Sequence, residues 1–210
     1  QGLATTERRR AALMRHLWRP RRFKSLLDRF GGQIPTPKSR TELLESADPM
    51  AAVGEVVGLR SRAEIAARIE ALREDQAAAP ISAMERELLD ALLDVRETAP
   101  NALAALRDIS VDLGSISPAV DGLSARLDAL SARGVDVEHL AFEASYGRTS
   151  MEYYDGFVFG FSAQSQPHLP PVATGGRYDA LTAVLGNGTG VPAVGGVIRP
   201  ALVAQLEAAT

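Results

Sequence analysis

The spacing of apolar residues changes near Gly134, and this change constrains the fold more than any other feature of the chain. Before it, apolar residues recur at the spacing of amphipathic helices. After it, short runs such as 157–161 are rich in aromatic and β-branched residues, which is typical of strands. Helices followed by strands and helices in this order predict an α+β domain on a mostly antiparallel sheet.

Helix starts are visible in the front part of the chain. Residues 6–27 predict two short helices, the second starting at Pro20. Serine and glutamate three residues apart, the spacing of a capping box, occur at 61–64 and 82–85. A further helix is predicted with Ser117 as its cap and Pro118 at its first position, ending at Gly134. The apolar stripes of these helices are interpreted as core.

The rear part predicts strands and turns. Runs 140–144 and 157–161 are interpreted as a hairpin, with its connection around Gly147. Gly175 and Gly176 are interpreted as a turn into a short helix. A last strand, 193–198, precedes a final helix that begins at Pro200.

Composition excludes several classes of protein. With 23 basic and 26 acidic residues the formal net charge is −3, which gives no general attraction to nucleic acid. The chain has no cysteine, so disulfides and thiolate metal sites are excluded. Basic residues gather at 8–10, 19, 21 and 22; we interpret them as a solvated helix face, with a phosphate-binding arm as the alternative.

The length of 210 residues suits one domain or a core with a helical appendage. We expect a mainly helical portion at 1–135 and core strands and helices at 136–210, forming one continuous domain. Since the chain begins at Gln1 and its motifs lie in the last third, we expect a missing N-terminal part. No run is apolar enough for a membrane helix or signal peptide, so the expected compartment is the cytoplasm.

Three motifs carry the chemistry of the chain. They lie at 152–159, 175–179 and 192–200, with the sequences EYYDGFVF, GGRYD and PAVGGVIRP. Tyr153 and Tyr154 are adjacent in a predicted strand, so their rings should point to opposite faces. Gly175–Asp179 combines close backbone approach with a cation, a phenol and a carboxylate. Taken alone, these motifs fit a structural tyrosine pair and a turn closed by an Arg–Asp contact as well as a binding site.

In order and spacing, these motifs resemble the amino-acid-binding strand, the GGRYD turn and the final strand–helix of the histidyl-tRNA synthetase family, a class II aminoacyl-tRNA synthetase fold with flanking helices and a helical insertion. The resemblance covers about the last 70 residues. It implies a histidine-binding site in which Tyr154 and Tyr178 lie beside the imidazole. The other implied members are Glu152, Tyr153, Gly175, Gly176 and Arg177.

The last motif departs from the synthetases. Where they continue as Gly-Leu-Glu-Arg, with the arginine holding ATP, this chain has Arg199-Pro200-Ala201-Leu202. Loss of one charge-stabilising donor commonly costs about 3 kcal/mol of transition-state stabilisation. We therefore expect no aminoacyl-adenylate formation and no catalytic residues. His16, His139 and His168 are scattered without metal-ligand spacing, so no metal and no cofactor are expected.

The chain is therefore similar to the non-catalytic relatives of the synthetase, the regulatory subunits of ATP phosphoribosyltransferase. This resemblance implies a partner, the short-form catalytic subunit, in the first step of histidine biosynthesis. It also implies self-association and allosteric feedback by L-histidine, without nucleic acid or membrane as partners. Two alternatives remain: a fragment of an authentic histidyl-tRNA synthetase, and a synthetase-like scaffold without ligand binding.

Overall fold

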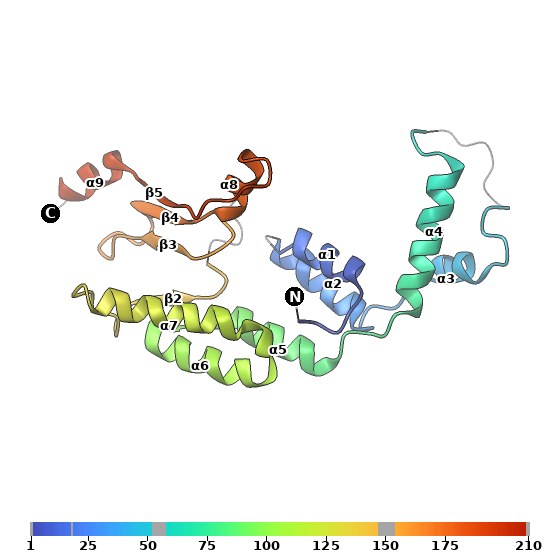
Figure 1. Cartoon of the computed structure of the whole chain (residues 1–210), viewed down its shortest axis with the longest axis horizontal. Helices are drawn as coiled ribbons and strands as arrows, with labels where there is room; N and C mark the ends of the chain where they lie inside the picture. Colours follow the sequence, from blue (N-terminus) through green and yellow to red (C-terminus); the bar gives the residue numbers. More distant parts are fainter. Residues whose placement is uncertain (1, 18, 52–57, 147–153, 209–210) are drawn as a thin grey trace. The chain divides into compact units, whose positions relative to one another are not determined.

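The computed structural model describes residues 2–17, 19–51, 58–146 and 154–208. The chain forms two compact units, Gln1–Ala144 and Ser145–Thr210. The first is mainly helical, and the second contains a three-stranded sheet (Figure 1). Helices combined with antiparallel strands agree with the predicted α+β class. The expected continuity of one domain across residues 1–135 and 136–210 stays a prediction.

The described elements of the first unit follow in chain order. They are α1 (Glu7–Arg15), α2 (Pro20–Phe30), α3 (Lys38–Glu45), α4 (Arg62–Ala77), α5 (Ala83–Asp94), β1 (Arg96–Thr98), α6 (Ala99–Asp112), the short 3-10 helix η1 (Gly114–Ile116), α7 (Ser117–Ser131) and β2 (Ala141–Glu143).

Helix starts in the first unit agree with their sequence signals. Both predicted capping boxes form, since the serine at 61 and at 82 accepts from the backbone N–H three residues later and the glutamate side chain accepts in return. The two N-terminal helices are also confirmed, as α1 and α2, with Pro20 at the first position of α2. The predicted cap at Ser117 is displaced by one residue: Ile116 is the N-cap, and Ser117 is the first residue of α7.

Two hydrophobic clusters hold the first unit together. One joins α6 and α7 and is made of Val95, Ala99, Ala102, Leu103, Leu106, Val120, Leu123 and Leu127. The other joins α1, α2 and the segment before α5, and is made of Leu13, Phe23, Leu27, Phe30 and Ile81. Leu123 and Leu127 of α7 therefore pack in the core, as the sequence predicts, and the stripe of α5 packs against both clusters while only partly buried. In α4, Ile69 is the buried residue.

One arginine of the basic cluster is buried rather than solvated. Arg9 is 6% exposed, and its Nε donates to Asp75 Oδ1 at 2.8 Å. Its Nη1 donates to the Ala79 carbonyl at 2.7 Å and its Nη2 to the Asp75 carbonyl. The guanidinium also lies 5.2 Å from the Phe30 ring centroid. For Arg9, the interpretation as part of a solvated face is wrong.

The predicted hairpin between 140–144 and 157–161 is wrong. β2 pairs antiparallel with β1, with Arg96 opposite Glu143, and these two side chains form an ion pair at 2.6 Å. The run at 157–161 pairs instead with a later strand, in the second unit. The connection expected near Gly147 lies outside the described residues.

The second unit contains β3 (Val158–Phe161), β4 (Ala173–Arg177), α8 (Asp179–Leu185), β5 (Val194–Ile198) and α9 (Pro200–Glu207). The strands form an antiparallel sheet in the order β3-β4-β5. Because β4 and β5 are antiparallel, α8, which follows β4, and α9, which follows β5, lie at opposite ends of the sheet (Figure 1). The predicted last strand and its proline-initiated helix are confirmed.

The prediction of a turn at Gly175 and Gly176 is wrong, because both glycines lie inside β4. They stand opposite Gly196 and Gly195 of β5, so four glycines meet at the centre of the sheet. The reason is steric and not conformational: aromatic rings from other segments occupy the space that side chains would need, as described below.

Among the residues that the structure describes, no helix combines the length and the apolar character needed to cross a bilayer.

Candidate functional site

The register of the second unit divides its sheet into two faces, because alternate residues of a strand point to opposite sides. Gly160 stands opposite Thr174, and Thr174 stands opposite Val197. Gly176 stands opposite both Val158 and Gly195. One face therefore carries Val158, Gly160, Thr174, Gly176, Gly195 and Val197, and we call it the tyrosine face.

Three tyrosines lie on this face, each against a glycine of a different strand. The pairs are Tyr146 with Gly160, Tyr154 with Gly176, and Tyr178 with Gly195. A methyl group added to Gly176 would lie 2.7 Å from Tyr154 Cδ1, and one added to Gly195 would lie 2.9 Å from Tyr178 Oη. The floor beneath the rings is consequently bare backbone, which lets aromatic groups approach it closely.

Tyr154 and Tyr178 form an aromatic pair. Their ring centroids are 6.1 Å apart and their planes are inclined by 53°, a tilted geometry that aromatic pairs favour. Tyr154 is only 4% exposed, whereas Tyr178 is partly buried. Tyr154 precedes β3 instead of lying within a strand. The chain bulges there, with the Asp155 N–H donating to the Arg177 carbonyl at 3.1 Å and the Arg177 N–H donating to the Phe157 carbonyl at 2.8 Å.

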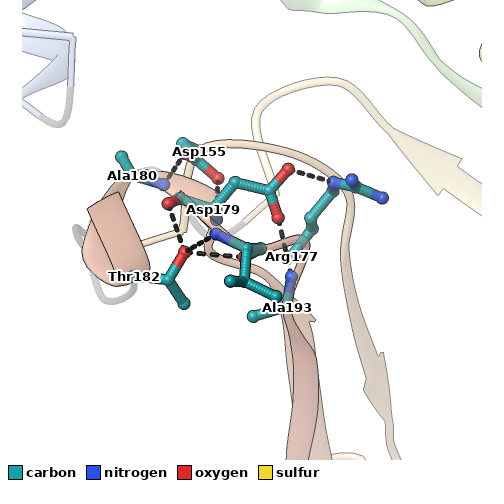
Figure 2. Close-up of polar contacts among 7 residues, drawn as sticks. Asp155, Arg177, Asp179, Ala180, Thr182 and Ala193 are labelled. Atoms are coloured by element: carbon teal, nitrogen blue, oxygen red, sulfur yellow. Dashed lines mark hydrogen bonds and ion pairs between the residues drawn. The ribbon is translucent and has the colours of Figure 1, made fainter. Parts of the chain in front are cut away.

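An aspartate directly follows each of these two tyrosines, Asp155 and Asp179, and its carboxylate accepts hydrogen bonds from the backbone of another segment (Figure 2). The Asp155 carboxylate accepts from the backbone N–H of Asp179 at 3.0 Å and of Ala180 at 2.5 Å. The Asp179 carboxylate accepts from the backbone N–H of Ala193 at 2.8 Å. These bonds tie the segment before β3, the start of α8 and the start of β5 together around the tyrosine pair.

Arg177 belongs to this network rather than to the tyrosine face. Its Nε donates to Asp179 Oδ2 at 2.7 Å. The backbone N–H of Ala193 and the Arg177 side chain together hold the pKa of Asp179 below its ordinary value. The Arg–Asp contact considered as an alternative from the sequence is therefore present, and it coexists with the tyrosine pair.

The opposite face of the sheet is lined by phenylalanines. Phe157, Phe159 and Phe161 form a row with ring centroids 6.0 and 5.8 Å apart. The Phe159 ring occupies the position where Gly175 would carry a side chain, and it lies 3.3 Å from the corresponding position at Gly196. Gly175 thus serves the phenylalanine face, whereas Gly176 serves the tyrosine face.

The structure brings together only part of the predicted histidine site. Tyr154, Tyr178 and Gly176 meet on the tyrosine face. The Arg177 side chain bonds Asp179, and Gly175 lies under Phe159. Glu152 and Tyr153 lie outside the described residues.

Sequence reasoning did not assign Arg199 to this face. Gly195, Val197 and Arg199 alternate along β5 and its end, which places them on the same side. Arg199 Nη1 donates to the Pro171 carbonyl at 2.9 Å, and both Nη atoms are 3.4 Å from Thr174 Oγ1. Counting alternate residues from the glycine pair was the signal that could have found it.

No metal centre is found among the described residues, where no three metal-ligating side chains gather. His168 is exposed, and His139 is exposed and bonds Asp136 through Nδ1 at 2.7 Å. Leu202 lies in the first turns of α9, so an apolar side chain stands where the resemblance places the ATP-binding arginine of the synthetases.

The family model described as histidyl-tRNA synthetase matches residues 43–201. The match spans both the helical part and the three-stranded sheet, and the chain belongs to this family.

Among its relatives are proteins named ATP phosphoribosyltransferase regulatory subunit from Brucella canis, Brucella suis and Brucella ovis. Each is 29% identical to this chain over 205 residues, and each match covers 85% of the chain and 53% of the relative. The chain thus spans about half the length of these curated relatives. No solved structure gives a significant match to it.

Proposed function

We propose that this chain is part of a non-catalytic regulatory subunit of ATP phosphoribosyltransferase, cytoplasmic and built on the class II synthetase fold. The intact protein binds the short catalytic subunit, supports its activity in the first step of histidine biosynthesis and self-associates. L-Histidine is the effector. The observation that carries the proposal is the tyrosine face: an aromatic site is kept on a glycine floor, while the adenylation arginine is replaced by Leu202.

In this proposal Tyr154 and Tyr178 contact the imidazole of histidine, over the backbone of Gly176. Aromatic rings and phenol hydroxyl groups suit this ligand, which has a flat ring with hydrogen-bonding nitrogens. Arg177 and Gly175 act indirectly in this proposal. Arg177 bonds Asp179, and Gly175 leaves room for the Phe159 ring on the opposite face. Glu152 and Tyr153 complete the proposed set.

Feedback then follows from linkage. Histidine binds one state of the assembly more tightly than the other, and the favoured state has lower activity. A coupling free energy of about 1 to 3 kcal/mol suffices for a clear response.

The test is phosphoribosyl-ATP formation by a short-form catalytic subunit, with and without the intact protein, across a histidine titration. We expect activation by the protein and reversal of that activation by histidine. Absence of activation would contradict the proposal.

A second candidate, a tRNA-charging histidyl-tRNA synthetase, is favoured by the family match alone. It predicts histidine-dependent exchange of pyrophosphate into ATP. We expect none, because Ala201 and Leu202 provide neither the acid nor the cation of the synthetase motif. Measured exchange above background would move this candidate to the front.

A further inference from the structure

We propose that Arg199 binds the carboxylate of the amino-acid ligand and thereby selects an amino acid over its decarboxylated amine. This inference rests on the histidine-binding function proposed above, and it names the group that recognises the other end of the ligand.

The charge of Arg199 favours an anionic ligand. Two arginines of the described sheet region carry the cations of this site, and they differ in their partners. Arg177 is neutralised by Asp179 at 2.7 Å, whereas none of the ion pairs among the described residues includes Arg199. Arg199 is nevertheless partly buried. A partly buried cation without a carboxylate favours an anionic ligand beside it.

The hydrogen bonds of the Arg199 side chain differ in length. The bond from Arg199 Nη1 to the Pro171 carbonyl, at 2.9 Å, anchors the guanidinium. The contacts to Thr174 Oγ1, at 3.4 Å, are at the long limit of hydrogen bonds. A carboxylate can replace these long contacts with shorter, charge-assisted bonds while the anchor remains.

Arg199 and Tyr178 lie at a spacing along the sheet that one amino acid can bridge. Tyr178 lies over Gly195, and the Arg199 guanidinium reaches Thr174, which stands opposite Val197. Gly195 and Val197 are one two-residue repeat apart, about 7 Å along the strand. Val197 is 58% exposed, so the floor at this point is open.

Tyr146 lies at the β3 side of the same area. Its ring is against Gly160 of β3, and Gly160 stands opposite Thr174 of β4. An amino acid with a ring side chain fits this arrangement with its ring at Tyr178 and its carboxylate at Arg199. The two ends of the ligand would then contact residues that follow different strands, Tyr178 after β4 and Arg199 after β5.

The test is calorimetric binding of histidine and of histamine to the intact protein. Histamine keeps the imidazole and the amine but lacks the carboxylate. We expect Arg199→Gln to weaken histidine binding by about tenfold or more and to leave histamine binding within about twofold. Arg199→Lys should retain part of the preference, since it keeps the charge but loses the planar fork. Arg133→Gln is the control, because that side chain is exposed and donates to the Ala129 carbonyl at 3.0 Å in the first unit.

A variant at another position tests the proposal even if the arginine variants misfold. Val197→Phe adds bulk to an exposed position, so it should fold while blocking both ligands. If the wild-type protein binds histidine and Arg199→Gln weakens histidine binding and histamine binding equally, the carboxylate role of Arg199 is overturned. Unchanged binding to Val197→Phe would overturn the location. Loss of ATP binding in Arg199→Gln with intact histidine binding would also overturn it, in favour of a phosphate. Wild-type protein that binds no histidine would instead overturn the proposed function itself.

Discussion

The Asp179 carboxylate accepts a hydrogen bond from the backbone N–H of Ala193 at 2.8 Å, and so joins the start of α8 to the start of β5. The same carboxylate binds Arg177. Both interactions favour its charged form, which is why its pKa is lowered in the folded protein.

The lowered pKa of Asp179 predicts a loss of stability in acid. A group whose folded pKa lies below its unfolded value stabilises the fold above the unfolded pKa, and this contribution disappears as the pH falls through the folded pKa. We expect the unfolding free energy to decrease below about pH 4, and to decrease less in Asp179→Asn. Denaturant unfolding at pH 2 to 6 measures this. Glu64, Glu85 and Asp136 also have lowered pKa values, but they contribute equally to both proteins. Parallel pH curves for wild type and variant would contradict the assignment.

Gly176→Ala should destabilise the second unit by about 1 to 3 kcal/mol. The added methyl group would lie 2.7 Å from both the Phe157 carbonyl oxygen and Tyr154 Cδ1, and a backbone oxygen cannot move away cheaply. Thermal unfolding by calorimetry is the measurement. Gly122→Ala is the matched control: that position is an exposed part of α7, and outside its own helix no described atom lies within 4 Å of the place for a methyl group. Alanine should therefore be neutral or stabilise by about 0.5 to 1 kcal/mol. Equal effects of both variants would refute the close approach of Tyr154.

Arg9→Gln should destabilise the first unit by about 3 kcal/mol, because it leaves Asp75 without its main partner at a largely buried site. Arg10→Gln is the control. Arg10 pairs with the exposed Glu7, and such surface pairs contribute less than about 1 kcal/mol. Urea unfolding curves of the two variants give the difference directly, and similar midpoints would show that burial of Arg9 adds nothing.

Tyr154→Phe and Tyr178→Phe should each weaken feedback by histidine while leaving basal activation of the catalytic subunit intact. Each change removes one phenol hydroxyl and keeps the ring that packs on the glycine floor. The readout is the histidine concentration for half-inhibition, which we expect to rise by about tenfold. Phe161→Tyr adds a hydroxyl on the opposite, exposed face and serves as the control. Unchanged feedback in both tyrosine variants would favour the scaffold without ligand binding.

Local signals were sufficient for the helices. A capping box is complete within four residues, so Ser61 and Glu64 determine the start of α4 whatever surrounds them. The start at Pro200 is similar, since proline in the first turn loses no helical hydrogen bond. These elements were predicted correctly because each signal and its effect occupy one stretch of chain.

Strand partners were not predictable in the same way. The pairing of β2 with β1 joins residues 47 positions apart through contacts such as Arg96 with Glu143, and β1 has only three residues between two helices. The glycines of β4 posed the same difficulty, because their reason lies in rings from other segments, Phe159 and Tyr154. The tyrosine pair was expected from the resemblance, but the position of Arg199 required the register.

The four central glycines of the sheet have a mechanical consequence. Phe159 lies against Gly175 and Gly196 on one side, and Tyr154 and Tyr178 lie against Gly176 and Gly195 on the other. The two aromatic layers are therefore separated by a single thickness of peptide backbone. At these positions no side chain lies between a ring and the strand backbone. A ring that moves toward the sheet therefore displaces the peptide groups directly, and with them the rings on the other face.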